Sequence, residues 1–239
     1  MPPTTEKIAL GQSMILDQPR EQFTEVELIA GSCIDIARTL IQEEPSLKVA
    51  IHNFANNERA GLYRKRPDGS LCFATNTQEE QLLRASIQDN HLYLNPEFYP
   101  ICPDDEEDEY ALRTTNIKFN KHPFTSKWLP KAERFEADMI TCPALNLYAR
   151  NYAQQTIEEV TSKRMLLCLN LAKDHDVFIT GLWGCGAFGH DILDTIRRWK
   201  MAFRNATGMP KKVVFAVYVD ILTNIDDGSK ILELCQQIL

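Results

Sequence analysis

The run VVFAVYV at Val213–Val219 contains only aliphatic and aromatic residues over the length of a β-strand. A strand with one wet face alternates apolar and polar residues, so a continuous apolar run indicates a strand that is buried on both faces. Similar runs stand at Lys48–Phe54 and Val177–Leu182, and another strand is predicted at Glu136–Cys142. Helices of ten or more residues are predicted among these strands. We therefore expect crossover connections and a largely parallel sheet.

Apolar residues at helical spacing predict the helices. They are expected at residues 24–42 with Thr24 as N-cap, from Thr77 or Gln78 onward with Leu82, Leu83 and Ile87 facing inward, and at Gln155–Ala172, Asp191–Asn205 and Ser229–Leu239. Residues 55–77 and 89–112 are expected to be irregular. The predicted fold class is α/β: one three-layer α/β/α domain at residues 23–239, with a mixed, mostly parallel central sheet, after an N-terminal extension at residues 1–22.

The net charge and the spacing of the cysteines exclude several classes of function. The formal charge of -7 argues against general nucleic-acid binding, because phosphate contacts need clustered Lys and Arg. No two of the seven cysteines are closer than 17 positions, which excludes CxxC zinc and redox motifs. We expect reduced thiols, a cytoplasmic location, and neither a metal nor a cofactor. The N-terminus shows no secretory signal and no stretch is long and apolar enough for a membrane span. The oligomeric state stays open, and the acidic run Asp104–Glu109 is expected to be a solvated loop.

Three segments with unusual residues follow predicted strands. They are HNFANNERAG from His52, the turn Thr141–Ala144, and GLWGCGAFGHD from Gly181. Ligands of open α/β sheets bind outside the carboxyl ends of the strands, so these segments are expected to form the site. The third carries four of the ten glycines, and a strand, glycine turn and helix present N–H groups and a helix N-terminus to an anion. A diphosphate fits this pattern, and Phe188 either stacks on the ligand or plugs the core.

Other residue patterns allow two interpretations. Glu79 and Glu80 open a helix, where carboxylates also complement the helix dipole, so the pair is either structural or functional. Cys185, His190 and Asp191 contain the residue types of a thiol hydrolase, but triad residues normally come from distant positions. We expect Cys185 to be a small residue of the ligand loop. His52 and Trp183 are expected to be core residues.

Several motifs, in order along residues 26–220, resemble the microbial-type poly(ADP-ribose) glycohydrolases, whose fold is a macrodomain. VAIHNFA at Val49–Ala55 is similar to the family strand that ends in Asn-Phe-Ala, and Gln78-Glu79-Glu80 to its Gln-Glu-Glu signature. DMITCP at Asp138–Pro143 is similar to its Asp-Val-Ile-Thr-Ser-Pro stretch. GLWGCGAFGHD is similar to its glycine loop, and VVFAVY to its penultimate strand.

The resemblance implies a site for ADP-ribose or an ADP-ribosylated protein. Glu80 would be the catalytic acid/base, assisted by Glu79, in cleavage of a ribose glycosidic bond. The implied binding residues are Asn53, Phe54, Ala55, Asn56, Gly61, Gln78, Thr141, Pro143, Gly184, Cys185, Gly186, Ala187, Phe188 and Gly189. The glycine loop would cradle the diphosphate, with Phe188 beside the distal ribose.

The chain departs from the family just before the Gln-Glu-Glu signature. The family carries a Gly-Gly-Gly run there, whereas this chain has ERAGLY at Glu58–Tyr63, in which only Gly61 is retained. An inserted basic cluster follows, made of Arg64, Lys65 and Arg66, with Arg59 nearby. It is either a solvated loop or a contact to phosphates. Two functions remain open: an ADP-ribosyl glycohydrolase acting on poly- or mono-ADP-ribose, and an ADP-ribose reader without turnover.

Overall fold

The fold is that of a computed structural model, which describes residues 1–13, 24–61, 63–65, 71–73, 76–86, 96–102, 109–217 and Glu233. The strands are β1 (Thr4–Ala9), β2 (Glu25–Ala30), β3 (Val49–Asn53), β4 (Tyr63–Lys65), β5 (Leu71–Phe73), β6 (Tyr110–Phe119), β7 (Phe135–Thr141), β8 (Val177–Gly181) and β9 (Lys212–Val217). The helices are α1 (Leu10–Ser13), α2 (Cys33–Glu43), α3 (Gln78–Ser86), α5 (Gln154–Ala172) and α6 (Ile192–Asn205), with short 3-10 helices η1 (Pro96–Phe98) and η2 (Lys131–Glu133).

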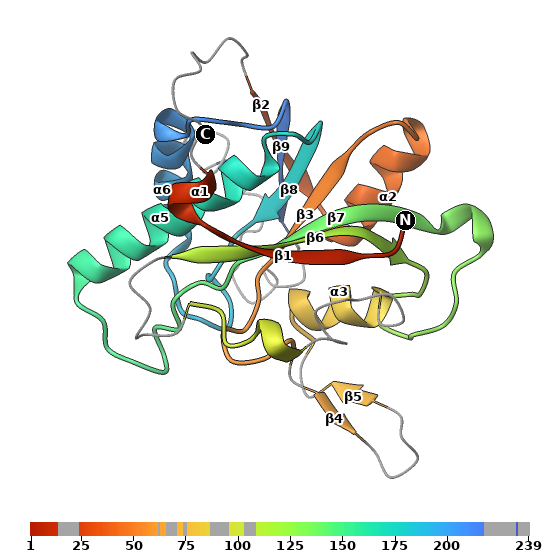
Figure 1. Cartoon of the computed structure of the whole chain (residues 1–239), viewed down its shortest axis with the longest axis horizontal. Helices are drawn as coiled ribbons and strands as arrows, with labels where there is room; N and C mark the ends of the chain where they lie inside the picture. Colours follow the sequence, from red (N-terminus) through yellow and green to blue (C-terminus); the bar gives the residue numbers. More distant parts are fainter. Residues whose placement is uncertain are drawn as a thin grey trace.

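Seven of the described strands form one mixed sheet in the order β1-β6-β7-β3-β8-β9-β2 (Figure 1). The five strands from β7 to β2 are parallel to their neighbours, and β6 pairs antiparallel with both β7 and β1. β4 and β5 form a separate antiparallel hairpin. The central strands β3 and β8 are buried along their whole length, as their continuous apolar runs predict.

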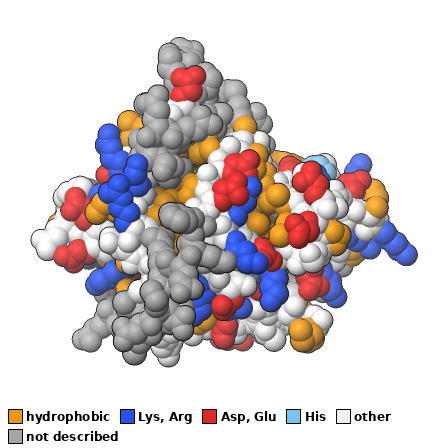
Figure 2. All heavy atoms as spheres, turned by 90° about the horizontal axis from the view of Figure 1, so that it is seen from above, with side chains coloured by type: hydrophobic (Ala, Val, Ile, Leu, Met, Phe, Trp, Pro, Cys, Tyr) orange, Lys and Arg blue, Asp and Glu red, His pale blue; other side chains and the backbone are white. Residues whose placement is uncertain are grey.

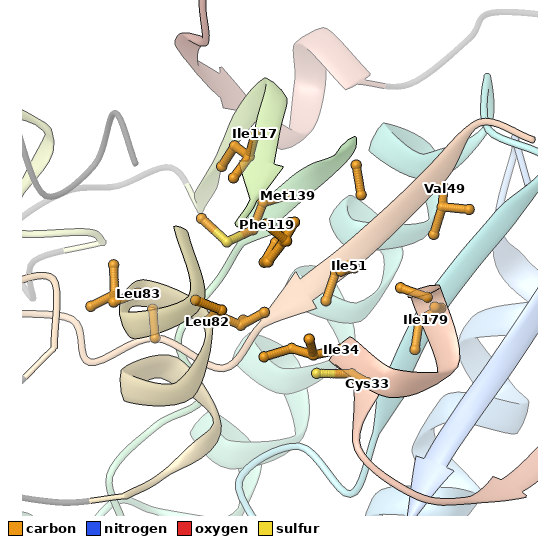
Figure 3. Packing of buried hydrophobic residues seen from close by; sticks show 14 of the residues in the cluster. Cys33, Ile34, Val49, Ile51, Leu82, Leu83, Ile117, Phe119, Met139 and Ile179 are labelled. Atoms are coloured by element: carbon orange, nitrogen blue, oxygen red, sulfur yellow. The ribbon is translucent and has the colours of Figure 1, made fainter. Parts of the chain in front are cut away.

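Helices cover both faces of this sheet. The helices α2 and α3 pack against one face of the sheet, and the core between them includes Ile34, Ile51 and Leu82 (Figure 3). Residues of α5 and α6 pack with the other face around Trp199 and Phe215. The predicted three-layer α/β/α fold with a mixed, mostly parallel sheet is confirmed. None of the described helices is both long and apolar enough to cross a membrane.

The helix predicted at residues 24–42 is wrong in its first part. Residues Glu25–Ala30 form β2, which pairs in parallel with β9, and the helix starts at Cys33. The true N-cap is Ser32, whose hydroxyl accepts the N–H of Asp35 at 3.2 Å. The spacing of the apolar residues in Glu25–Ala30 is compatible with a helix and with a strand. Hydrogen bonding to β9 makes this segment a strand.

Further differences concern segments without strong periodicity. The region expected to be irregular at residues 55–77 contains β4 and β5, and residues 89–112 include η1 and the start of β6. Within the predicted extension at residues 1–22, β1 joins the sheet beside β6. The boundary after residue 22, Ile87, residues 104–108 and the terminal helix at 229–239 lie outside the described residues, except for the helical Glu233.

The remaining predicted elements are confirmed within a residue or two. They are the strands β3, β7, β8 and β9 and the helices α3, α5 and α6.

Asp138 and His175 link β7 to the end of α5. The Asp138 carboxylate hydrogen-bonds the His175 ring at 3.0 Å and accepts the Asn116 N–H at 2.9 Å. Burial raises the pKa of Asp138, but these hydrogen bonds outweigh burial and the net pKa lies below its usual value. A lowered folded pKa stabilises the protein above the unfolded value near 3.8, and this contribution disappears as the pH falls through the folded value.

Asp138→Asn should therefore lower the free energy of unfolding at pH 7 by about 1.5–3 kcal/mol, the range for hydrogen bonds to charged groups. Urea unfolding at pH 7 and pH 3 measures this, and the difference from the parent chain should shrink at pH 3. Asp35→Asn removes an exposed carboxylate that pairs with Arg38, and it is the matched control with a change below about 1 kcal/mol. An equal deficit at both pH values would contradict the assignment.

Candidate active site

The side chain of Gln78, at the start of α3, is hydrogen-bonded to the backbone at the end of β3. Its Oε1 accepts the Phe54 N–H at 2.9 Å, and its Nε2 donates to the His52 carbonyl at 2.5 Å. The side-chain amide of Gln78 thus satisfies one backbone N–H and one backbone carbonyl at the end of β3. The contact places the first turn of α3, with Glu79 and Glu80, beside Asn53 and the loop that follows β3.

Glu79 is a buried carboxyl in a polar pocket, with 2% of its surface exposed. Its Oε2 accepts the Asn56 N–H at 2.9 Å, and its Oε1 lies 3.5 Å from Asn53 Nδ2. Burial raises the pKa of Glu79 to about 7, and the nearby Glu80 adds to the rise. Hydrogen bonds from the Asn56 and Gly61 N–H groups and from Asn53 oppose it. Glu79 can therefore hold or release a proton near neutral pH.

Tyr99 is a site residue that the sequence interpretation missed. Its hydroxyl donates to Glu79 Oε1 at 3.4 Å, and burial, with Glu79 beside it, raises the pKa of Tyr99 well above its usual range. The segment that carries Tyr99 is fixed to the loop after β3, because the Ile101 N–H donates to the Asn57 carbonyl at 2.7 Å. Tyr99 stands in the proline-rich stretch predicted to be irregular, where no periodic signal points to the site.

Glu80 forms the glutamate half of a capping box at the start of α3. Its Oε2 accepts the backbone N–H of Thr77 at 3.0 Å and also the Thr77 hydroxyl. The sequence Thr77-Gln78-Glu79-Glu80 is a Ser/Thr-x-x-Glu pattern, in which the third helical residue reaches back to the N-cap. Glu80, which is also 2% exposed, therefore has a structural role at the start of the helix, and its catalytic role stays a prediction. The same contact fixes the Glu80 carboxylate next to Glu79.

Asn53 joins the ends of two parallel strands. Its Nδ2 donates to Thr141 Oγ1 at 3.3 Å, and its carbonyl accepts the Cys142 N–H at 3.2 Å. Asn53 Oδ1 is buried and has no hydrogen-bond partner among the described residues. Buried polar atoms are nearly always paired, so this acceptor suits a donor that a ligand supplies. Asn53, Thr141, Glu79 and Glu80 therefore come together as predicted.

The glycine loop after β8 needs glycine for different reasons at different positions. Gly184 has φ +81, and a Cβ there would lie 2.6 Å from the His190 ring. Gly189 has φ +78, and a Cβ there would lie 2.8 Å from the Tyr148 ring. Gly186 is different, because a Cβ built on it meets nothing within 4 Å and its φ is not in the left-handed region. The fold does not need glycine at position 186, so this position is open for a ligand.

Three consecutive backbone N–H groups in this loop, those of Gly186, Ala187 and Phe188, donate to no described residue. Such N–H groups can bind an anion. The N-terminus of α6, which the sequence analysis also expects to face the anion, is instead capped by Asp191, whose carboxylate accepts the Asp194 N–H at 2.8 Å. An acidic cap disfavours an anion there, so the loop N–H groups are the candidate anion site of this segment.

The glycine loop is fastened to the segment after β7. Trp183 Nε1 donates to the Cys142 carbonyl at 3.0 Å, and the His190 ring Nε2 donates to the Leu145 carbonyl at 2.8 Å. The Pro143 carbonyl accepts from the buried Arg164, which also pairs with Glu109 at 2.6 Å. These contacts hold the second and third predicted segments in one arrangement. Among the described residues, no hydrogen bond joins the glycine loop directly to Glu79, but β3 and β8 are neighbours and end at the same edge of the sheet.

The structure decides most of the alternatives left by the sequence. His52 is a core residue whose Nδ1 hydrogen-bonds Thr180 at 2.9 Å, and burial lowers its pKa to about 3. Trp183 is 1% exposed, as predicted. Cys185 lies 3.3 Å from the Thr195 hydroxyl, while His190 is engaged by Leu145, which is not the arrangement of a thiol triad. Phe188 packs on the core but stays partly exposed, so both of its predicted roles remain open.

The other predicted binding residues lie beside these groups. Ala55 and Gly61 are buried in the loop after β3, and Gly61 has φ +61. Of the basic cluster, Arg59 is exposed, whereas Arg66 and the side chains of Arg64 and Lys65 are outside the described residues. Within the described ranges, no group of three or more His, Cys, Asp or Glu is placed to hold a metal ion.

Comparison with known proteins shows what the chain is similar to. Residues 9–117, which include β3 and the start of α3, match the family described as microbial-type PARG, catalytic domain. The chain resembles the microbial-type poly(ADP-ribose) glycohydrolases. No curated protein matches the chain in sequence.

Solved structures show the same fold. A poly(ADP-ribose) glycohydrolase from Thermomonospora curvata, bound to the inhibitor ADP-HPD, superposes with a TM-score of 0.71 at 21% identity, covering 98% of this chain and 85% of that chain. The T267R mutant of the Deinococcus radiodurans glycohydrolase, in complex with ADP-ribose, gives a TM-score of 0.71 at 20% identity, covering 98% and 94%. The resemblance to microbial-type poly(ADP-ribose) glycohydrolases and their macrodomain fold is thus confirmed.

The raised pKa of Glu79 predicts a pH-dependent stability. Between pH 4.5 and about 7 the unfolded carboxyl is ionised while the folded one keeps its proton, so the folded protein loses stability as the pH rises. Glu79→Gln removes this ionisation and should be more stable than the parent chain at pH 8, by up to about 3 kcal/mol. Urea unfolding at pH 5 and pH 8 should show an advantage that shrinks at pH 5.

Glu80→Gln is the matched control for that experiment. It weakens the capping box, so it should destabilise the chain by about 1 kcal/mol without the pH pattern of Glu79→Gln. A Glu79→Gln variant that is less stable than the parent at both pH values would show that Glu79 is a well-satisfied carboxylate instead of a protonated one.

Proposed function

We propose that the chain is an ADP-ribosyl glycohydrolase, which binds ADP-ribose and cleaves the ribose glycosidic bond of poly- or mono-ADP-ribosylated substrates. The observation that carries this proposal is the pair of buried carboxyls in the first turn of α3, Glu80 held by Thr77 and Glu79 held beside Asn53. The same sheet edge carries the unpaired N–H groups of the glycine loop. A pair of buried carboxyls beside a candidate anion site suits the cleavage of a diphosphate-bearing glycoside.

Binding would use groups that the fold leaves without partners. The N–H groups of Gly186, Ala187 and Phe188 would bind the diphosphate, and Asn53 Oδ1 would accept from a hydroxyl of the distal ribose. Asn56 would lie near the same ribose. The remaining proposed contacts are Phe54, Ala55, Gly61, Gln78, Thr141, Pro143, Gly184, Cys185 and Gly189.

Cleavage needs one proton delivered and one removed. The departing acceptor atom must gain a proton as the bond to ribose C1″ breaks, and the attacking water must lose one as its bond to C1″ forms. We assign both transfers to Glu80, held by Thr77, and a supporting role to Glu79. With its pKa near 7, Glu79 is partly neutral at working pH, which reduces repulsion between the adjacent carboxyls.

A reader without turnover is the second candidate function. It is favoured by the replaced Gly-Gly-Gly run, where this chain has Glu58–Gly61 with Ala60 and Gly61 buried. Side chains then stand where bare backbone approaches the ligand in the family. In a reader, the same residues would bind ADP-ribose and no bond would be cleaved.

The cellular setting is also a proposal. The five cysteines whose side chains the structure describes are free thiols, which supports the reduced cytoplasmic compartment expected from the sequence. The expected partner is ADP-ribose or an ADP-ribosylated protein, and general nucleic-acid binding is not expected.

Glu80→Gln should abolish release of ADP-ribose from modified protein, because the amide cannot exchange a proton, while binding of free ADP-ribose changes by less than about tenfold. Release is measured from poly- and mono-ADP-ribosylated protein, and affinity by calorimetry. Binding without any release by the parent chain would identify a reader, and release by Glu80→Gln would remove Glu80 from the mechanism.

Gly186→Val separates ligand binding from folding. A Cβ at position 186 meets no described heavy atom within 4 Å beyond its chain neighbours, so thermal stability should stay close to that of the parent chain. If the diphosphate lies on the loop N–H groups, the added methyl groups should weaken ADP-ribose binding by at least about tenfold, or 1.4 kcal/mol. Gly184→Val is the contrasting variant, since it collides with His190 and should destabilise the fold. Unchanged ADP-ribose affinity of Gly186→Val would place the diphosphate elsewhere.

A further inference from the structure

The connection between β6 and β7 is strongly basic in a chain of net charge -7. We refer to residues 118–134 as the basic hairpin. It carries five Lys and Arg residues against a single acidic one, Glu133. The cations are Lys118, Lys121, Lys127, Lys131 and Arg134. None of them forms an ion pair with another described residue. Their charge is therefore directed at solvent or at a partner, although Glu136 lies across from Lys118 on β7.

The basic hairpin is a built structure with its own hydrogen bonds. The His122 N–H donates to the Lys127 carbonyl at 2.8 Å, and the Leu129 N–H donates to the Asn120 carbonyl at 2.9 Å. At its base, the rings of Phe119 and Phe135 stack at 4.8 Å and are buried. Its side chains therefore project from a fixed frame, which lowers the entropy lost on binding.

Aromatic side chains lie among the cations. Trp128 is 53% exposed and Phe124 is 40% exposed. Lys121 Nζ lies 4.9 Å and the Arg134 guanidinium 5.3 Å from the centre of the Trp128 ring. The Leu129 carbonyl also accepts from Arg134 Nε at 3.0 Å. Positive charge interleaved with exposed aromatic rings is the pattern of proteins that bind single-stranded nucleotide polymers, through phosphates and stacked bases.

The basic hairpin is attached to the helix that carries the catalytic carboxyls. The N–H groups of Asn120 and Lys121 both donate to the Ala85 carbonyl at 3.1 Å, and Arg84 donates to the Pro123 carbonyl. Ala85 is near the C-terminal end of α3, whereas Glu79 and Glu80 are in its first turn. A helix of nine residues is about 13 Å long. A ligand longer than one ADP-ribose unit can therefore reach from the carboxyls toward the basic hairpin.

The figures agree with this placement. In Figure 1 the connection from β6 to β7 forms the right-hand end of the molecule. In the view of Figure 2 the same end shows Lys and Arg side chains beside hydrophobic ones. The surface is thus at one end of the chain's long axis, separate from the glycine loop.

We propose that the basic hairpin is a second binding surface for ADP-ribose polymers, which holds units beyond the one at Glu79 and Glu80. The inference rests on the proposed function and deepens it, because it assigns the chain a preference for polymeric substrate. The negative net charge of the whole chain repels a general polyanion. A polymer whose terminal unit is held at the carboxyls brings its next phosphates to this surface at high effective concentration.

The test is polymer binding in the Glu80→Gln background, which keeps the substrate intact. Lys121→Ala/Lys127→Ala/Lys131→Ala should weaken binding of long ADP-ribose polymer by at least about tenfold at low salt, and leave affinity for monomeric ADP-ribose within about twofold. The matched control, Lys163→Ala/Arg197→Ala/Arg204→Ala, removes three exposed cations from α5 and α6 and should change polymer affinity by less than about twofold. Fluorescence anisotropy with labelled polymer measures both.

Salt dependence is a second readout. Neutralising three phosphate contacts should lower the slope of log affinity against log salt by about 2, since each contact to a single strand contributes about 0.7. Trp128→Ala should also weaken polymer binding, because it removes the ring against which two of the cations pack. Urea unfolding of each variant confirms that these exposed changes leave the fold intact.

Three outcomes overturn the proposal. Equal loss of polymer affinity in the basic-hairpin and control variants would show that only net charge matters. Equal loss for monomer and polymer would place the effect in the main site. Tighter binding of single-stranded oligonucleotide than of polymer through the same residues would make the surface a nucleic-acid site. A different outcome would separate the two proposals. If the parent chain binds polymer through the basic hairpin but releases no ADP-ribose, the glycohydrolase proposal is refuted and the basic hairpin remains a polymer-binding surface.

Discussion

The paired hydrogen bonds of the Gln78 side chain fix the geometry on which the site depends. A parallel strand that ends inside a protein leaves backbone groups that need partners, and Gln78 satisfies the Phe54 N–H and the His52 carbonyl at the end of β3. The start of α3 is thereby held at that point, and the capping box of Thr77 and Glu80 orients its first turn. The Gln-Glu-Glu signature thus combines a positioning residue with two carboxyls whose surroundings it determines.

Much of the architecture follows from local pattern. Continuous apolar runs predict β3, β8 and β9, because a strand that is buried on both faces has no solvent-exposed face for polar residues. Parallel strands end at one edge, so the residues after β3, β7 and β8 were expected to converge. They do so through contacts of Asn53 with Thr141 and of Trp183 with Cys142. The roles of these residues in catalysis stay proposals.

The sequence did not predict features that depend on distant pairing. The apolar spacing of Glu25–Ala30 fits a helix and a strand alike, and only β9 decides between them. Tyr99 reaches Glu79 from a segment without periodicity, and its position depends on a contact between Ile101 and Asn57. The cap of α6 by Asp191 is also visible only in the structure, since Asp at that position could face a ligand or the helix.

The two outer strands of the sheet bear on how the chain behaves in a crowded solution. Of the described strands, β1 and β2 lie at the edges, and each has only six residues. Both carry charge along the strand: Glu6 and Lys7 in β1, and Glu25 and Glu27 in β2, which pair with Lys212 at 3.3 and 2.5 Å. Charged side chains on short edge strands oppose the addition of a strand from a second molecule. The sheet is thereby protected against edge-to-edge aggregation.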